Sequence, residues 1–193
     1  VMIDRIDKNL NVSSIQVNEE QAANRATRHL IEHGYRDIGI ICGPTTMLNT
    51  QDRLRGWRQA LEDAGLNVNA SWIFSTDYTR AGGYEATQRL LRGPRPRALF
   101  TTNEQQALGC LRALAEHGLN VPDDVALVCF NATPESQYNV PSLTAVCQPV
   151  TRMAQAAVGM LKAWDGEARH CEFAFDLQHG ESCGCKPVKR PTS

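Results

Sequence analysis

The sequence lacks any hydrophobic run long enough to cross a membrane. None of its apolar stretches approaches the roughly 18 residues that a spanning helix needs, and the N-terminus, Val1 to Arg5, has neither the basic region nor the long apolar core of a secretory signal. An excess of one charge is also lacking, because 20 basic and 21 acidic residues leave a formal net charge of −1. This balance excludes a broad basic surface that grips nucleic acid. We expect a soluble, cytoplasmic chain without a membrane partner.

The motifs of common enzyme classes are missing as well. The segment Gly43 to Thr46 lacks the spacing of a phosphate-binding loop, and no GxGxxG run follows a predicted strand. A GxSxG nucleophile elbow is also absent from the sequence. We therefore predict no catalytic residue and no cofactor.

The cysteines do not form a disulfide pattern. There are seven, an odd number without regular spacing, and most lie in apolar stretches where Cys behaves as a small hydrophobic residue. Cys183 and Cys185 are the one closely spaced pair, and His29 and His33 stand four residues apart but lack the HExxH context. The remaining candidate ligands near the cysteine pair are scattered: His170, Cys171 and His179. We predict no metal site on this spacing.

Short β-rich runs alternate with segments of helical period along the whole chain. This alternation predicts an α/β fold with mostly parallel sheets, and 42% hydrophobic residues suffice for a packed core. Asn18 is the predicted N-cap of the first long helix, and Ala115 and Trp164 are expected to face inward on later helices. The predicted strands are 1–3, 14–17, 38–42, 72–74, 97–101, 125–130, 143–147 and 172–177, and the predicted helices are 19–32, 52–64, 81–91, 104–117 and 151–164.

Polar side chains follow the carboxyl ends of several predicted strands. Ligands of open α/β sheets bind outside those ends, so these residues are the candidate binding site. They are Asp4, Asn49, Arg53, Thr101, Thr102, Asn103, Asn131 and Gln148. One cation, one carboxylate and several amides suit a neutral polyol or a nucleobase. Each amide taken alone is better explained as a loop cap or Asx-turn, and it is their common position at strand ends that favours a binding site. Arg53 is the strongest candidate, because a planar guanidinium can donate to two ligand oxygens at once.

A series of motifs resembles the effector-binding core of LacI/GalR-type bacterial transcription regulators, which share their fold with periplasmic sugar-binding proteins. Each motif is modest, but their order and spacing along nearly the whole chain are specific. The matching stretches are 1–5, 22–38, 42–44, 53–57, 60–61, 64–66, 98–103, 107–109, 116–125 and 141–149.

The resemblance implies a type I periplasmic-binding-protein-like fold, with two Rossmann-like lobes and an effector in the cleft between them. It implies that 1–17 and 149–177 are what remains of an incomplete N-terminal lobe, that 18–148 and 178–187 form the C-terminal lobe, and that 188–193 are a mobile tail. The family's effector pocket maps onto the strand-end residues with Val17 added: Asp4, Val17, Asn49, Arg53, Asn103, Asn131 and Gln148. The family's DNA-binding headpiece has no counterpart in this sequence.

Three features depart from the family pattern. The usual Gly-Phe-Asp-Asp run reads Cys129 to Ala132, which places the amide of Asn131 where the family has a carboxylate. The usual Asn-Asp pair appears as Asn103-Glu104, and the acidic and amide pair before the first long helix appears as Asn18-Glu19. These changes leave the chemistry of the effector open, as sugar-like or nucleoside-like.

The leading hypothesis is an effector-sensing and dimerising domain of a transcription regulator, which reaches operator DNA only through a headpiece outside this sequence. Leu108, Leu111 and Tyr138 match the family's dimer surface, and an exposed aromatic beside an apolar helix favours a self-complementary patch. The alternative for the helix residues is that they simply belong to the core. A solute-binding protein for sugar transport is the alternative function, and an enzyme on the same sheet is a third.

Overall fold

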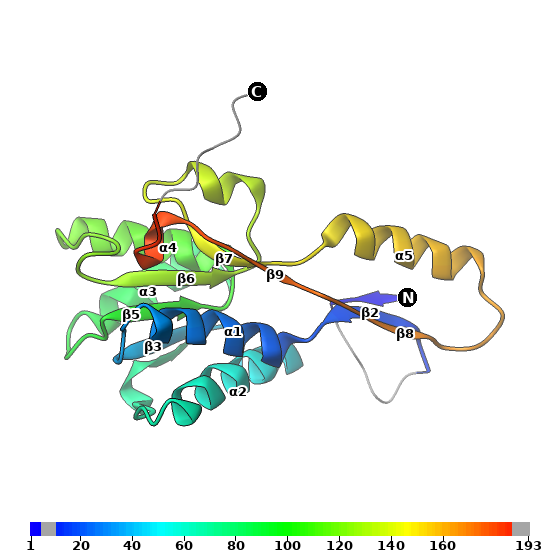
Figure 1. The fold of residues 1–193 in the computed structure, drawn as a ribbon, viewed down its shortest axis with the longest axis horizontal. Coiled ribbons are helices and arrows are strands. Elements are labelled where there is room, and N and C mark those ends of the chain that lie inside the picture. Colours follow the sequence, from blue (N-terminus) through cyan, green and yellow to red (C-terminus); the bar gives the residue numbers. More distant parts are fainter. Residues whose placement is uncertain (5–10, 187–193) are drawn as a thin grey trace.

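The computed structural model describes residues 1–4 and 11–186 and contains two sheets (Figure 1). The small sheet has the order β1 (Met2–Ile3), β2 (Ser14–Val17), β8 (His170–Phe173), with parallel pairing throughout. The large sheet has the order β4 (Ile73–Ser75), β3 (Ile38–Cys42), β5 (Ala98–Thr101), β6 (Ala126–Phe130), β7 (Thr144–Cys147), β9 (Asp176–Gln178). Its strands are parallel except β9, which runs antiparallel to β7. The fold is the predicted α/β fold with mostly parallel sheets.

Helices cover both faces of the large sheet. The helices α1 (Glu19–Glu32) and α2 (Leu48–Asp63) pack together, as do α3 (Arg80–Leu90) and α4 (Glu104–Glu116). Alternate strand residues divide between two cores: Ile38 and Ile40 pack with α1 and α2, whereas Ile41 and Leu99 pack with α3 and α4. Because successive strand side chains point to opposite faces, the continuously apolar strands are buried on both sides, as expected of a doubly wound sheet.

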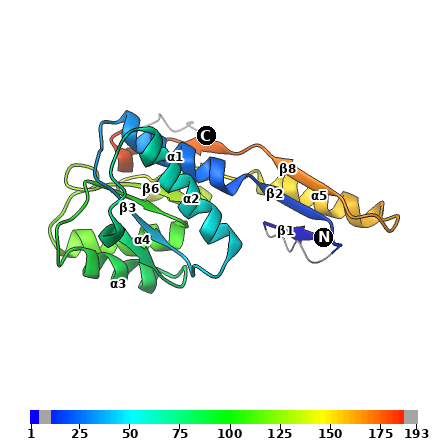
Figure 2. The same cartoon turned by 90° about the horizontal axis from the view of Figure 1, so that it is seen from below.

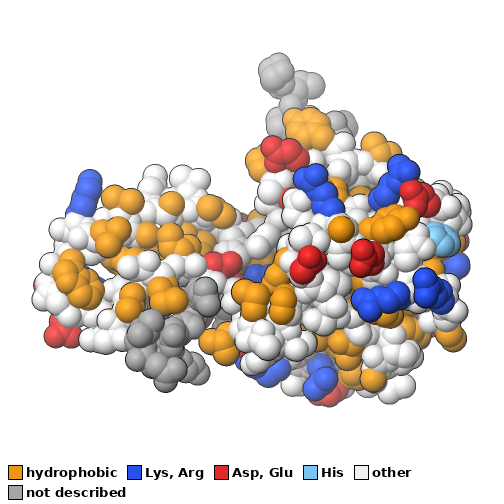
Figure 3. Space-filling model, turned by 180° about the vertical axis from the view of Figure 1, so that it is seen from behind, with side chains coloured by type: hydrophobic (Ala, Val, Ile, Leu, Met, Phe, Trp, Pro, Cys, Tyr) orange, Lys and Arg blue, Asp and Glu red, His pale blue; other side chains and the backbone are white. Residues whose placement is uncertain are grey.

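The small sheet is accompanied by α5 (Val150–Lys162), which contacts β1 and β2. Figure 2 shows this part standing beside the large sheet, joined to it by extended segments. In Figure 3, hydrophobic side chains are scattered over this part, with few charged ones among them, whereas most of the charged side chains in this view lie on the larger part. No helix within residues 1–4 and 11–186 combines the length and the apolar character required to cross a membrane.

Local signals explain where the helices begin and how closely they pack. The Asn18 side chain accepts a hydrogen bond from the Gln21 backbone N–H, which confirms the predicted N-cap of α1. In α2, Gly56 lies against α1 so closely that a Cβ there would be 2.0 Å from the Glu20 carbonyl oxygen. The absence of a side chain at this position therefore lets the two helix backbones touch.

Several sequence predictions need correction. The predicted strand 72–74 begins later, because Ala70–Trp72 form the short 3-10 helix η1, and α2 begins at Leu48 rather than at residue 52. Ala115 is exposed, because the buried face of α4 runs through Ala107, Cys110 and Leu114, which recur three and four residues apart. Trp164 is 52% exposed, because α5 ends at Lys162 and the helical period no longer applies beyond it.

The predicted strand 172–177 is two strands in two sheets. Phe173 pairs with Val17 in the small sheet, and Asp176 pairs with Cys147 in the large one, so the chain crosses between the sheets at residues 174 and 175. We keep as a proposal the predicted division into two lobes, 1–17 with 149–177 and 18–148 with 178–187. The assignment of strands to the two sheets agrees with it except at residues 176 and 177, which belong to the large sheet. The tail predicted for 188–193 lies outside the described residues.

Candidate functional site

A cavity of about 310 Å³ lies between the two parts of the molecule, at the carboxyl ends of β1, β6 and β7. Asp4, Asn131 and Gln148 follow these three strands and line it. The other lining residues are Ile3, Ala132, Thr133, Val150 and Met153. Figure 3 shows the surface indented where the two parts meet. The cavity is therefore at the place where an open α/β sheet binds ligands.

The polar lining residues hold one another through hydrogen bonds. The Gln148 Nε2 amide donates to Asn131 Oδ1 at 2.8 Å and to Asp4 Oδ1 at 3.3 Å. From α2, the Asn49 Nδ2 amide donates to the Asp4 backbone oxygen at 2.8 Å. Asp4 and Asn131 both adopt left-handed backbone conformations, with φ of 57° and 61°, which Asp and Asn tolerate better than other non-glycine residues. Residues from both parts of the molecule thus form one polar network.

Arg53 is not among the residues that line the cavity. Its Nε donates to Glu19 Oε2 at 2.5 Å and its Nη1 donates to the Thr102 carbonyl at 2.6 Å. The guanidinium carbon is 3.9 Å from the ring centroid of Phe130, the residue before Asn131. Only 3% of Arg53 is exposed. In this structure the Arg53 guanidinium donates to a carboxylate and a backbone carbonyl of the protein itself. That it donates to two ligand oxygens stays a prediction.

Glu19 does not line the cavity, but its carboxyl interacts with that of Asp4, which does, and the strand-end reasoning missed it. Burial raises the pKa of its carboxyl from 4.5 to about 7, against the opposing attraction of Arg53, and nearby Asp4 raises that pKa further. Its Oε1 atom is buried and has no hydrogen-bond partner within residues 1–4 and 11–186. The sequence signal was an acidic residue directly after the Asn18 cap, in the first turn of α1.

Two of the predicted binding residues, Asn103 and Val17, contact other parts of the protein instead of the cavity. Asn103 caps α4, accepting from the Gln106 backbone N–H at 2.8 Å, and donates to the Tyr78 carbonyl at 2.8 Å. Val17 is 1% exposed and belongs to the core. Neither is among the residues that line the cavity, and for Asn103 the alternative of a loop cap describes the contacts seen.

Glu104 connects α4 to the cavity. This carboxylate is 5% exposed and accepts from the Thr133 backbone N–H at 3.3 Å and from its hydroxyl at 3.0 Å. Thr133 in turn lines the cavity. The Asn103-Glu104 pair, noted in the sequence as a departure, therefore caps a helix with one residue and positions the cavity wall with the other.

The lining offers hydrogen-bonding chemistry rather than catalysis or metal binding. Asp4 is its one carboxylate, Asn131 and Gln148 supply amides, and the described lining contains neither an imidazole nor a thiol. Ile3, Val150 and Met153 add an apolar side. A small polar molecule with one apolar face fits such a site, whose volume is at the lower end of the range of about 300 to 1,000 Å³ for ligand pockets.

The predicted dimer residues are only partly buried by this chain. Leu108 and Leu111 pack against the second core cluster but are half-exposed, whereas Cys110 between them is buried. Tyr138 is 73% exposed and Val140 is 95% exposed. Cys110 therefore belongs to the core, whereas each of the other side chains leaves apolar surface uncovered on the large part.

The chain is similar to a known family and to characterised regulators. The profile of the periplasmic binding protein-like domain matches residues 27–171. The HTH-type transcriptional repressor PurR of Haemophilus influenzae is 36% identical over 154 residues, which are 79% of this chain and 46% of that protein. PurR of Escherichia coli is 39% identical over 137 residues, which are 70% of this chain and 40% of that protein. The chain spans about half the length of the curated relatives it matches.

Solved structures agree with the sequence relatives. A sugar-binding transcriptional regulator of the LacI family from Escherichia coli, complexed with phosphate, has a TM-score of 0.83 at 30% identity. The match covers 93% of this chain and 66% of that one. A putative LacI-family regulator from Sanguibacter keddieii has a TM-score of 0.84 at 35% identity, with 90% of this chain and 68% of that one covered. The regulator CelR in complex with cellobiose has a TM-score of 0.81 at 30% identity, with 89% and 54% covered.

Proposed function

The chain belongs to the periplasmic binding protein-like domain family, in its branch of LacI-type regulators, and from this premise we propose that it senses a small-molecule effector and transmits binding to an operator-binding headpiece. The observation that carries the proposal is the cavity between the two parts, to which both contribute polar side chains. A ligand that bridges Asp4 and Asn131 binds one relative placement of the two parts better than others. By that differential affinity it shifts the equilibrium between them.

The proposed effector is a sugar-like or nucleoside-like molecule. Two amides and a carboxylate match the hydroxyl and ring N–H groups of such ligands, and Ile3, Val150 and Met153 can cover an apolar face. The solved relatives include one regulator described as sugar-binding and one in complex with cellobiose. Those descriptions support the polar, neutral class of effector without naming its member here.

We also propose that two copies associate through the large part. Leu108 and Leu111 keep apolar surface outside the core, and Tyr138 and Val140 are exposed on the same large part. A two-fold dimer would present two headpieces to a palindromic operator, and effector binding could alter their spacing. The proposed place of action is the cytoplasm, where such regulators meet DNA.

The alternatives receive less support. The relatives are transcriptional regulators, which favours regulation over a solute-binding role in transport. For an enzyme, the described cavity lining supplies no nucleophile, base and orienting group in mutual contact.

The experiment is a thermal-shift screen of the protein against monosaccharides, disaccharides, nucleobases and nucleosides. A ligand at 100 times its dissociation constant should stabilise the folded state by about 2.7 kcal/mol. Stabilisation by at least one compound supports the proposal, and a uniform lack of effect across all four classes would contradict it.

A further inference from the structure

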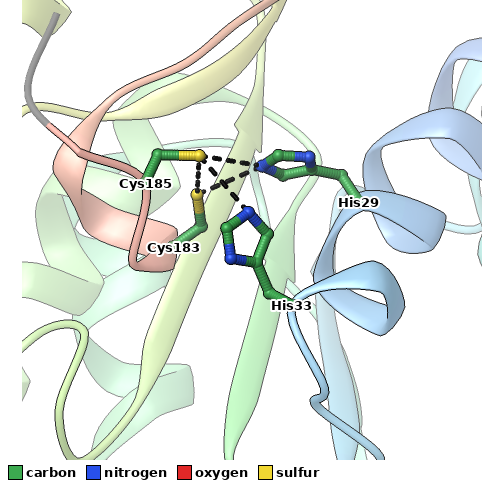
Figure 4. A group of neighbouring side chains, drawn as sticks. All are labelled: His29, His33, Cys183 and Cys185. Carbon is green, nitrogen blue, oxygen red and sulfur yellow. Dashed lines mark hydrogen bonds between the residues drawn. The ribbon is translucent and has the colours of Figure 1, made fainter.

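Four side chains with metal-binding atoms converge at the far end of α1 from the cavity (Figure 4). His29 lies in the last turn of α1 and His33 is its C-cap residue. Cys183 ends the 3-10 helix η3 (Glu181–Cys183), and Cys185 follows two residues later. Their ligand atoms all lie within 4.8 Å of one another. The sequence placed these two pairs about 150 residues apart, which is why the spacing argument predicted no metal site.

The backbone explains how each pair points the same way. Residues four apart on a helix lie on the same face, which places the two imidazoles side by side. Between the cysteines, Gly184 has a φ of 91°, a backbone conformation that residues other than glycine rarely adopt. This turn brings the two sulfur atoms to 3.4 Å from each other.

The distances between the ligand atoms approach those of a tetrahedral zinc site. Cys183 Sγ is 3.2 Å from His29 Nε2, and Cys185 Sγ is 3.5 Å from His29 Nε2 and 3.3 Å from His33 Nε2. With zinc–sulfur bonds of about 2.3 Å and zinc–nitrogen bonds of about 2.0 Å, neighbouring ligand atoms of a tetrahedron are roughly 3.3 to 3.8 Å apart. Shifts of a few tenths of an ångström would bring these three distances and the sulfur–sulfur distance to that geometry, and the two remaining pairs of ligand atoms lie within 4.8 Å.

We propose that His29, His33, Cys183 and Cys185 form a structural site for a zinc ion. Two thiolates and two imidazoles are ligands that zinc prefers, whereas calcium and magnesium require oxygen ligands. Four protein ligands close the coordination sphere, as structural rather than catalytic sites do. This proposal is independent of the effector site, because it uses none of the cavity residues.

The surroundings provide both support and access. Cys183 is buried, and its sulfur lies 3.0 Å from the Thr144 hydroxyl in β7, so one ligand is anchored in the large sheet. His33 is exposed, which gives an ion a route to the site. His179 Nδ1 lies 3.8 Å from Cys185 Sγ and can contribute an outer contact. A bound ion would tie the segment after β9 to α1, and so fix the chain where it returns from the small sheet.

The test is the zinc content of the reduced protein after zinc loading and gel filtration, measured by mass spectrometry. We expect about one zinc per chain, a higher melting temperature than the chelator-treated protein, and, with cobalt in place of zinc, the absorption bands of a tetrahedral thiolate site. The variants Cys185→Ser and His33→Gln should lose these cobalt bands and most of the zinc.

Matched controls separate the site from general effects. Cys171→Ser removes an exposed cysteine in β8, and His117→Gln changes the C-cap residue of α4, the position that His33 holds on α1. Both controls should retain one zinc per chain. Circular dichroism checks that every variant is folded. Absence of zinc from the reduced wild type, equal zinc in Cys185→Ser and wild type, or a Cys183–Cys185 disulfide whose reduction yields no zinc binding would overturn the proposal.

Discussion

Arg53 and Glu19 form a buried ion pair that joins α2 to the first turn of α1, with only 3% and 8% of their side chains exposed. A second pair between the same helices, Arg55 with Glu20, is exposed and lies on the solvent side. The two pairs differ in burial while sharing residue types and helices. Exposed ion pairs contribute little to stability. Substitutions in the exposed pair are therefore a control for the effect of burial in substitutions of the buried pair.

The substitution Arg53→Lys should damage both stability and effector binding. A lysine cannot donate simultaneously to Glu19 and to the Thr102 carbonyl as the guanidinium does. We expect the free energy of unfolding to fall by about 2 kcal/mol and effector affinity to fall tenfold or more, about 1.4 kcal/mol. Urea unfolding and titration calorimetry with a compound from the thermal-shift screen measure the two effects.

Arg55→Lys is the control for that variant. Its side chain is exposed, so the free energy of unfolding should change by no more than about 0.5 kcal/mol. Equal effects of the two substitutions on stability, or unchanged affinity in Arg53→Lys, would remove Arg53 from the account of the site.

Glu19 should make stability depend on pH. Because burial raises its folded-state pKa from 4.5 to about 7, the folded protein binds this proton more tightly than the unfolded chain. The contribution of Glu19 to stability is therefore fully present below about pH 4.5 and is lost as the pH rises through about 7. The variant Glu19→Gln lacks this loss. From about pH 5 to pH 8, the difference between its free energy of unfolding and that of the wild type should therefore shift by about 2 to 3 kcal/mol in favour of the variant.

Urea unfolding of both proteins at the two pH values makes the comparison, with Glu20→Gln, an exposed neighbour, as the control. A difference in free energy between Glu19→Gln and wild type that is the same at both pH values would show that Glu19 does not titrate in this range.

The glycine in α2 should be sensitive to a single methyl group. A Cβ at Gly56 would lie 2.0 Å from the Glu20 carbonyl oxygen in α1, a backbone atom that cannot turn aside. We expect Gly56→Ala to lower the free energy of unfolding by about 1 to 3 kcal/mol. In α5, a Cβ at Gly159 meets nothing within 4 Å, so Gly159→Ala should instead stabilise by roughly 0.5 to 1 kcal/mol. Thermal denaturation decides, and two changes of the same sign would contradict the packing described.

The assembly proposal predicts that Tyr138→Asp weakens a dimer. Tyr138 is 73% exposed and, like the partly buried Leu108 and Leu111, belongs to the large part, and a carboxylate at position 138 would be desolvated in an interface. Sedimentation at micromolar concentration should give a dimer for the wild type and for Trp164→Asp, an exposed site on the small part. A monomeric wild type with intact fold would refute the interface.

The elements of the fold were accessible from sequence because local patterns dictate them. Strand 38–42 is apolar throughout and is buried on both faces, and the spacing of Ala22, Ala26 and Leu30 identifies the inward side of α1. The division of residues 170–178 between two sheets was not accessible, since it depends on which partner strand each half meets. Trp164 was assigned inward by extending a period beyond the end of its helix.

The site was accessible in part for a similar reason. The rule that ligands bind at strand ends located Asp4, Asn131 and Gln148, which line one cavity. It could not distinguish these from Asn103, whose amide caps a helix, nor reveal Glu19, whose importance depends on burial beside Arg53. The grouping of His29 with Cys183 depends on tertiary contact alone.

The most direct test of the account is titration calorimetry of Gln148→Ala with the compound that stabilises the wild type in the thermal-shift screen. Gln148 is the suitable position, because its amide joins Asp4 and Asn131 and its backbone, unlike theirs, needs no left-handed conformation. Gln155→Ala, an exposed position in α5, is the control and should bind as the wild type does. The account predicts at least tenfold weaker binding to Gln148→Ala, about 1.4 kcal/mol; equal affinity in all three proteins would contradict the assignment of this cavity as the effector site.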